Sequence, residues 1–299
     1  PPATNPHYLR PTCHRNKPYM VMEASIDMTV LGVDVSKWQP AVDWETLKAS
    51  GVEFVFIKAT QGDYHTDPML LSHLEGANRV GMVIGLYHWC DPLVSYESQA
   101  QYFINVTKGL NFHMASADVE QFWASWQEWS DKNITKFLAP ETISENARNI
   151  LAYWKARIPQ VPVLYSRASF IHAYARPMMD WLNDEYPPLW VAHYPYNTDT
   201  ITTTWDMFKA KHLPKIPSPD LPQGCTKWKF WQFTGDKFLL PGIYSKANRS
   251  ALSATDVNFW NGTLDELHKF ANYVPAQEEK PPMTVTGKAL GVWLAPDRT

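Results

Sequence analysis

The sequence predicts an α/β fold, an incomplete (β/α) barrel of the TIM type with fewer helices than strands. Three observations support this prediction: apolar strands alternate with amphipathic helices, about eight strands can be counted, and 299 residues suffice for one domain of barrel size. Alternating strands and helices favour parallel pairing, and about eight such strands favour closure into a barrel. Active sites of such barrels lie at the carboxyl ends of the strands, so functional side chains are sought there.

The elements of this barrel follow one another from Leu31 onward. Buried strands, seen as short apolar runs, are predicted at residues 31–36, 52–58, 82–88, 114–120, 161–166, 189–194, 229–233 and 254–257. Helices are predicted between them at about residues 42–51, 68–79, 95–107 and 140–158. Asp43 is the expected N-cap of the first helix, and Gly51 is expected to end it. The proline-rich connection 206–227 is predicted to be a long loop, which leaves the last strands without helices.

Charge and composition exclude several kinds of partner. The chain carries 27 basic and 30 acidic residues, and this near-neutral balance gives no basic footprint for nucleic acid. No apolar run is long enough to cross a membrane, so membrane insertion is not expected.

His88 and His193 lack a third ligand at metal spacing, and the three cysteines are scattered, so no metal or other cofactor is predicted. The start at Pro1, without an initiator methionine or a signal peptide, indicates a processed or trimmed form.

Two carboxylates, Asp118 and Glu120, end the strand that begins at Met114. Side chains alternate along a strand, so both acids point the same way, with Cα atoms roughly 6 to 7 Å apart. Like charges this close can keep a proton on one partner at neutral pH, and an acid beside an anion is what glycosidic bond cleavage needs. The motif is short, and a pair that caps a helix or lies on a solvated loop is the alternative reading.

Polar and aromatic side chains recur at the other predicted strand ends. They are Asp34, Lys58, Tyr87, His88, Tyr165, Tyr194, Gln232 and Asp256. Aromatic residues make up 14% of the chain, and they can supply either core volume or flat surfaces for sugar rings. Asp34 can equally cap a helix, and the strand-end aromatics can equally plug the barrel, so the residues alone leave these roles open.

Seven short motifs stand at these strand ends in chain order. They are GVDVS at 32–36, FIKATQG at 56–62, GLYHW at 85–89, DVE at 118–120, LWVAHY at 189–194, WQFT at 231–234 and DVN at 256–258. Together they resemble the successive strand-end motifs of the family 25 glycoside hydrolases, which are lysozymes of the N-acetylmuramidase type from bacteria, phages and some fungi. The resemblance covers residues 31–262, and seven motifs in the family's order make it specific.

The resemblance implies hydrolysis of the β-1,4 bond between N-acetylmuramic acid and N-acetylglucosamine by an incomplete α/β barrel. Glu120 would be the general acid and base, and Asp118 would assist the 2-acetamido group of the substrate. Asp34 and Asp256 would complete the acidic cluster. Substrate contacts are expected from Tyr87, Lys58, Tyr165, Trp190, Tyr194, Gln232 and Trp38.

The expected partner is therefore the glycan strands of peptidoglycan, met by a secreted or cell wall-associated monomer. The sequence departs from the family pattern at Gln61, where Glu is common, and in segment 121–136, which is longer than usual. Residues 31–273 form the expected catalytic barrel, after an irregular N-terminal arm at 1–30. Residues 274–299 begin as a polar linker and then faintly resemble the start of a truncated SH3-like wall-binding module, with a disordered tail as the alternative.

Two other functions stay open on the sequence alone. One is a catalytically silent barrel that binds peptidoglycan or another polysaccharide, but the intact set Asp34, Asp118 and Glu120 favours an enzyme, because a binder needs no proton donor. The other is a chitinase-type hydrolase. It lacks support, since Phe112 and Ala115 stand where the first two acids of the longer chitinase signature would be.

Overall fold

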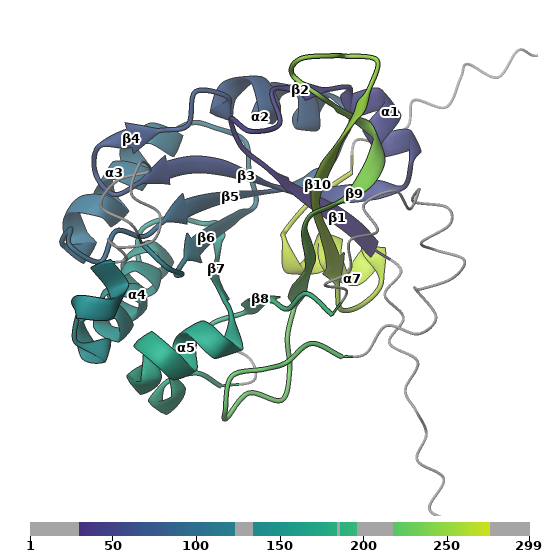
Figure 1. The fold of residues 1–299 in the computed structure, drawn as a ribbon. Helices are drawn as coiled ribbons and strands as arrows, with labels where there is room; N and C mark the ends of the chain where they lie inside the picture. The colour runs from purple at the N-terminus through teal and green to yellow at the C-terminus, as the bar shows by residue number, and fades with distance from the viewer. Residues whose placement is uncertain (1–29, 123–133, 184–185, 196–217, 276–299) are drawn as a thin grey trace, which may run out of the picture.

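The computed structural model describes residues 30–122, 134–183, 186–195 and 218–275 of the chain. In this part of the chain, eight strands close into a barrel (Figure 1). In order around the barrel they are β1 (Val30–Val35), β3 (Val52–Gln61), β5 (Val83–Trp89), β6 (Met114–Asp118), β7 (Val161–Ser166), β8 (Leu189–Ala192), β9 (Phe230–Tyr244) and β10 (Leu252–Trp260). The barrel strands from β1 to β9 run parallel, and β10 is antiparallel to both its neighbours. Two short strands, β2 (Ala41–Val42) and β4 (His65–Thr66), pair with β9 and β3.

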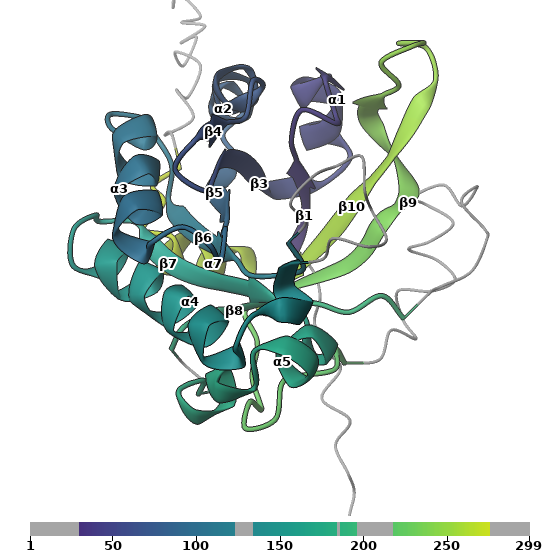
Figure 2. The ribbon, with the colours of Figure 1, turned by 60° about the vertical axis from the view of Figure 1, so that its left-hand side comes forward.

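The described residues form six α-helices, fewer than the barrel strands, which confirms the predicted incomplete barrel. They are α1 (Trp44–Ala49), α2 (Leu70–Arg79), α3 (Tyr96–Thr107), α4 (Pro140–Lys155), α5 (Ala168–Tyr174) and α7 (Leu264–Phe270), with 3₁₀ helices η1 (Ile134–Phe137) and η2 (Arg176–Asp180). Helices α1 to α5 lie outside the strands, whereas β9 and β10 extend as a hairpin past the rim (Figure 2). Asp43 caps α1 as predicted, because its Oδ1 accepts the N–H of Thr46 at 3.0 Å.

Side chains of the barrel strands alternate between two apolar layers. One layer faces the helices and contains Ile57 and Leu86. The other fills the barrel and contains Phe54, Phe56 and Phe230, whose rings pack against one another at centroid distances of 5.1 to 6.1 Å. The period of two therefore assigns every second strand residue to the interior, including the polar residues near the strand ends.

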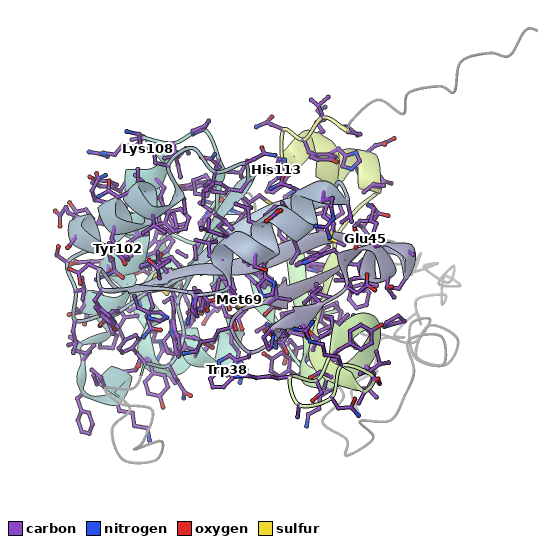
Figure 3. The ribbon with its side chains drawn as sticks, turned by 90° about the horizontal axis from the view of Figure 1, so that it is seen from above. Trp38, Glu45, Met69, Tyr102, Lys108 and His113 are labelled. Atoms are coloured by element: carbon purple, nitrogen blue, oxygen red, sulfur yellow. The ribbon has the colours of Figure 1, made fainter. Side chains whose placement is uncertain are left out.

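The barrel interior is closed at the amino ends of its strands. Gly32 and Gly85 make the close packing there possible, since a Cβ on either would lie 2.3 Å from the phenylalanine ring that faces it. Helix α7 contributes Leu267 to the same interior cluster. Trp38, just beyond β1, lies at the opposite end of the molecule from α7 (Figure 3). Only the carboxyl end of the barrel is thus left for polar side chains and a ligand.

The β9–β10 hairpin is longer than the two short strands predicted at 229–233 and 254–257. Gly235, Pro241 and Gly242 fall within β9, and such residues usually mark turns, which explains the shorter prediction. Gly242 has φ +97°, and a Cβ there would lie 2.6 Å from the backbone nitrogen of Leu47 in α1. The glycine therefore lets the hairpin bend against α1.

Several predicted segments fall outside the described residues. They include residues 1–29 of the N-terminal arm, 276–299 of the tail, 123–133 after the acids and 196–217 of the long connection. Among the helices that are described, none has the length and apolar character needed to span a bilayer.

Candidate active site

Four carboxylates lie at the rim formed by the carboxyl ends of the parallel strands. Asp256 reaches this rim from the middle of the antiparallel strand β10 and not, as predicted, from a strand end. Asp34 of β1 is the direct register partner of Asp256 of β10. Asp118 is the last residue of β6, and Glu120 lies two residues beyond it. Asp34 and Asp118 are buried, and the charge of Asp34 helps to raise the pKa of both Asp118 and Glu120. Residues from three separate strands thus form one acidic cluster.

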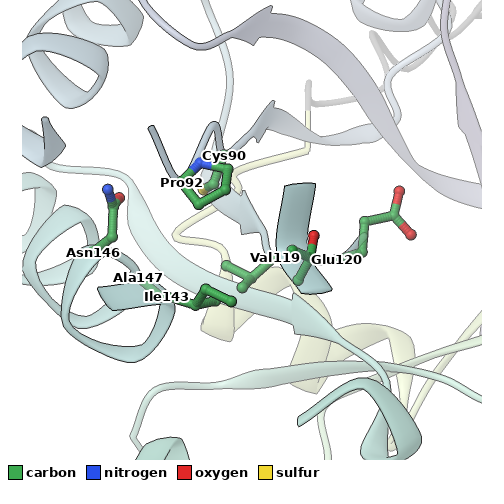
Figure 4. A pocket seen from close by; sticks show the side chains of 8 residues that line it. Cys90, Pro92, Val119, Glu120, Ile143, Asn146 and Ala147 are labelled. Atoms are coloured by element: carbon green, nitrogen blue, oxygen red, sulfur yellow. The ribbon is translucent and has the colours of Figure 1, made fainter. Parts of the chain in front are cut away.

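Asp118 and Glu120 share a side because the residue between them points the other way. Val119 is buried and lines a small pocket with Ile143 and Cys90 (Figure 4). The carboxylate of Glu120 points away from that pocket. The strand-like alternation therefore continues beyond the end of β6 and directs both acids to the barrel side, as expected from their i, i+2 spacing.

Both carboxyl groups of this pair hold protons more tightly than usual. Burial raises the pKa of Glu120 to about 7, and Asp34 adds to the rise, while Arg167 and Lys58 oppose it. Burial, followed by the charge of Glu120, raises the pKa of Asp118 well above its usual value. Because the two groups also repel each other when both are ionised, the pair retains a proton near neutral pH and offers an acid beside an anion.

This raised pKa predicts a dependence of stability on pH. The unfolded chain loses the Glu120 proton near the ordinary pKa of 4.5 and the folded chain near 7, so the free energy of unfolding falls as pH rises through that window. The Glu120→Gln variant has no titrating group at this position, so this fall in the free energy of unfolding should be absent. We therefore expect the difference in melting temperature, variant minus parent, to be larger at pH 8 than at pH 4. An equal difference at both pH values would contradict the raised pKa.

Gln232 of β9 joins the acids to two tyrosines. Its Oε1 accepts the hydroxyl protons of Tyr165 and Tyr194 at 2.7 and 2.6 Å. Its Nε2 donates to Asp34 Oδ2 at 3.0 Å and to Asp256 Oδ2 at 3.2 Å. Since the two hydroxyls donate to the amide oxygen, the amide nitrogen must face the carboxylates, and Gln232 fixes both acids in place.

Asn258, which the sequence analysis did not select, is a second amide that holds Asp34. Its Nδ2 donates to Asp34 Oδ2 at 2.7 Å, and its Oδ1 accepts the indole N–H of Trp190 at 2.8 Å. Trp190 differs from the expectation of a sugar contact, because its side chain is only 2% exposed and stacks on Phe56 at 3.9 Å. The half-buried Tyr87 lies edge-on to it at 6.4 Å. Trp190 therefore supports the floor of the site, with no free face for a ligand.

Lys58 of β3 brings a cation to the acids. Its side chain is 8% exposed, its ammonium lies 4.4 Å above the Trp89 ring, and its Nζ donates to Gln61 Oε1 at 3.3 Å. Burial lowers the pKa of Lys58, while the charges of Asp118 and Glu120 oppose that change. The cation stabilises the ionised partner of the acid pair.

Two surface pockets flank the acidic cluster. We call the first the Arg167 pocket; it is lined by Glu120, Gln121, Tyr165, Arg167, Ser169, Phe170, Ala173 and Tyr174. The second, the Lys58 pocket, is lined by Lys37, Trp38, Lys58, Gln61, Tyr64, His65 and Asp67. The Trp38 side chain is 67% exposed, so its ring can serve as a flat surface for a sugar.

The two strand-end histidines have structural partners. Gln99 Oε1 accepts the backbone N–H of Asp91 at 3.0 Å and lies 2.9 Å from His88 Nε2, which must therefore be the protonated nitrogen. Nδ1 of His88 then accepts from the Thr60 hydroxyl at 2.7 Å, and burial lowers the pKa of His88 to about 4. His193 Nδ1 accepts the backbone N–H of Asp220 at 3.2 Å. In the described part of the chain, no group of three or more His, Cys, Asp or Glu side chains is arranged so that it could hold a metal ion.

Comparison with known proteins identifies the family. The family model described as "Glycosyl hydrolases family 25" matches residues 33–243, more than half of the chain. The chain belongs to glycosyl hydrolase family 25. Among family relatives, the N,O-diacetylmuramidase of Chalaropsis sp is 38% identical over 252 residues, which cover 81% of this chain and 99% of that protein. Lysozyme M1 of Streptomyces globisporus is 25% identical over 262 residues, with 81% and 71% of the two chains covered.

The fold comparison agrees with this family 25 assignment. The crystal structure of the bacterial lysozyme from Streptomyces coelicolor superimposes with a TM-score of 0.62 at 24% sequence identity, covering 81% of this chain and 97% of that one. The family indicated by the seven strand-end motifs is thereby confirmed, and the protein is a glycoside hydrolase.

Proposed function

We propose that this family 25 hydrolase is a lysozyme of the N-acetylmuramidase type, cleaving the β-1,4 bond between N-acetylmuramic acid and N-acetylglucosamine in peptidoglycan. The observation that carries the proposal is the placement of Glu120 and Asp118 on one side at the open end of the barrel, where burial raises the pKa of both carboxyl groups and the pair retains a proton. The names of two relatives, a lysozyme and an N,O-diacetylmuramidase, support the choice of substrate. Because peptidoglycan lies outside the cell membrane, we propose a secreted or wall-associated protein that acts as a monomer.

Glu120 is the proposed general acid. Its pKa of about 7 leaves it protonated at mildly acid pH, so it can donate to the glycosidic oxygen as the bond breaks. The same carboxylate then removes a proton from the incoming water. Lys58 favours the ionised form that exists between these two steps.

Asp118 is proposed to receive the 2-acetamido group. Its Oδ1 is buried and has no hydrogen-bond partner within the described residues, so a substrate N–H can satisfy it. A hydrogen bond to the ionised carboxylate favours that form and shifts the shared proton toward Glu120. Substrate binding thus places the proton on the residue that donates it.

Asp34 and Asp256 are proposed to stabilise the positive charge that develops on the sugar ring. Gln232 holds both carboxylates by one amide group, so they need not reorient during the reaction. The proposed sugar contacts are Trp38, Lys58, Tyr87, Tyr165, Tyr194 and Gln232, while the enclosed Trp190 is assigned to packing.

The test is digestion of purified peptidoglycan, followed by mass spectrometry of the products. Fragments that end in reducing N-acetylmuramic acid support the proposal. Fragments that end in reducing N-acetylglucosamine would indicate the other glycosidic bond. Absence of any product would favour the alternative function, a barrel that binds polysaccharide without cleaving it.

The proposed role of Glu120 predicts the pH dependence of activity. The free protein must hold the Glu120 proton to act as an acid, so kcat/KM should fall as pH rises above about 7. The optimum is therefore expected on the acid side of neutrality. The measurement is kcat/KM on soluble peptidoglycan fragments between pH 4 and pH 9, and a rate that still rises at alkaline pH would contradict the assignment.

A further inference from the structure

The Arg167 pocket opens directly beside the proposed acid. Glu120 and Tyr165 line it together with Ser169 and Tyr174 of α5. Its volume is about 260 Å³. At about 30 Å³ per water molecule, such a space holds a substituent with several heavy atoms. A group attached to a sugar at the scissile bond can therefore enter it.

Arg167 gives this pocket a positive charge. It is exposed at the N-cap of α5, and its guanidinium lies 5.0 Å from the ring centroid of Tyr194. Within the described ranges, no carboxylate lies at ion-pair distance from Arg167. Its planar set of N–H donors suits a carboxylate, which it can hold by two parallel hydrogen bonds.

Building on the proposed function, we propose that Arg167 binds a carboxylate of the substrate, carried either by the lactyl ether of muramic acid or by its peptide stem. N-acetylmuramic acid differs from N-acetylglucosamine by that lactyl group, so a cation beside the scissile bond distinguishes peptidoglycan from neutral acetamido-sugar polymers. Arg167 is thus a residue that determines specificity and does not take part in bond cleavage.

Carboxylate binding at Arg167 also acts on Glu120. Among the described residues, the charged or titratable groups that face Glu120 are Asp34, Asp118, Lys58, Arg167, Tyr165 and Tyr194. Among them Arg167 lowers the pKa of Glu120, and a bound anion offsets its charge. The pKa of Glu120 is therefore higher in the complex than in the free protein, which keeps the acid protonated when the charged substrate is present.

The experiment compares peptidoglycan fragments with the same fragments after their carboxyl groups have been converted to methyl amides. A hydrogen bond between two charged groups corresponds to roughly a tenfold to hundredfold difference in binding. The kcat/KM of the parent should therefore be at least about tenfold higher on the charged fragments than on the amidated ones. Arg167→Gln should reduce this ratio to near one, and Arg167→Lys should give an intermediate ratio. Arg176→Gln, an exposed arginine of η2 outside the pocket, is the matched control and should keep the parent ratio.

The pH profiles supply a readout that a purely structural role would not change. On the charged substrate, kcat should begin to fall at a higher pH than kcat/KM, which separates the basic limbs of the two profiles. The pH dependence of kcat reflects the pKa of Glu120 in the substrate complex, and that of kcat/KM reflects its pKa in the free protein. On the amidated substrate the separation between the two limbs should be smaller, because only the effect of the substrate N–H on Asp118 remains. In Arg167→Gln the limb of kcat/KM should move to higher pH, since the opposing cation is gone.

The outcomes separate this inference from the proposed function. Equal cleavage of charged and amidated fragments by the parent, or an unchanged ratio in Arg167→Gln with parent-like melting temperature, overturns the role of Arg167 and leaves the lysozyme proposal standing. A parent that releases no muramic-acid reducing ends from any substrate overturns both. Glycan stripped of its peptide stems distinguishes the two sources. The lactyl carboxyl is an uncharged amide wherever a stem is attached, so a preference on stem-bearing fragments that disappears without stems assigns the stem. A preference that appears only where the lactyl carboxyl is free assigns the lactyl carboxylate.

Discussion

Replacing Glu120 with Gln should lower kcat on peptidoglycan by about 10² to 10⁴-fold, the usual contribution of general acid catalysis. The amide is nearly the same size as the carboxyl group, but it cannot donate the proton that the leaving oxygen needs. Glu120 is half-buried between Lys58, Arg167 and the other acids, and a neutral side chain is compatible with that position. The measurement is the initial rate of reducing-end release at saturating substrate and pH 5 to 6.

The matched control is Glu75→Gln, which makes the same chemical change at an exposed position of α2. It should keep the parent rate. Thermal melting of both variants checks that the fold is intact. If Glu120→Gln hydrolyses peptidoglycan at close to the parent rate while its melting curve shows a folded protein, Glu120 is not the acid.

The acidic cluster was predictable because strand geometry fixes where its members point. Asp34, Asp118 and Glu120 each stand at or just beyond the end of an apolar run, and closure of a parallel barrel brings such ends to one rim. The i, i+2 spacing also placed Asp118 and Glu120 on one side. Local periodicity and the rules of parallel sheets can both be read from the sequence, so the positions and directions of these three side chains could be predicted from it.

Contacts between distant residues were not predictable in the same way. Gln232 holds Asp34 across 198 positions, and Asn258 holds it across 224, so their roles appear only when the barrel closes. Trp190 and Tyr194 both fall in the strand predicted at 189–194, but Trp190 is the second residue of β8 and Tyr194 lies two residues beyond its end. One ring is therefore enclosed and the other half-buried. Arg167 follows a strand without any motif, and only the pocket reveals its position beside Glu120.

Asp118→Asn should lower kcat by about 10² to 10³-fold, the cost of removing one preorganised group that stabilises the transition state. The amide keeps an acceptor oxygen for the substrate N–H, but it lacks the negative charge that balances positive charge on the acetamido group. Asp118 is 6% exposed, with Oδ1 unpartnered in the described part of the chain, so its charge acts with little screening. Asp180→Asn, at an exposed position of η2, is the control and should retain the parent rate.

The position of Asp118 also predicts the stereochemical course. Retaining enzymes with a protein nucleophile place two carboxyl groups about 5 to 5.5 Å apart across the scissile bond, and inverting enzymes leave about 6.5 to 9.5 Å for a water. Asp118 and Glu120 instead leave one strand on one side, so they approach the sugar from the same direction. That arrangement favours attack by the substrate's own 2-acetamido oxygen, which retains configuration without a sugar bound to the protein.

The test follows fresh product by NMR before mutarotation and searches for an adduct by intact-protein mass spectrometry with a slow substrate. The β-anomer should appear first, and the mass of the protein should stay unchanged. An initial α-anomer would exclude retention. A sugar trapped on Asp118 would show that this carboxylate is the nucleophile, and Asp118→Asn would then have to form no adduct at all.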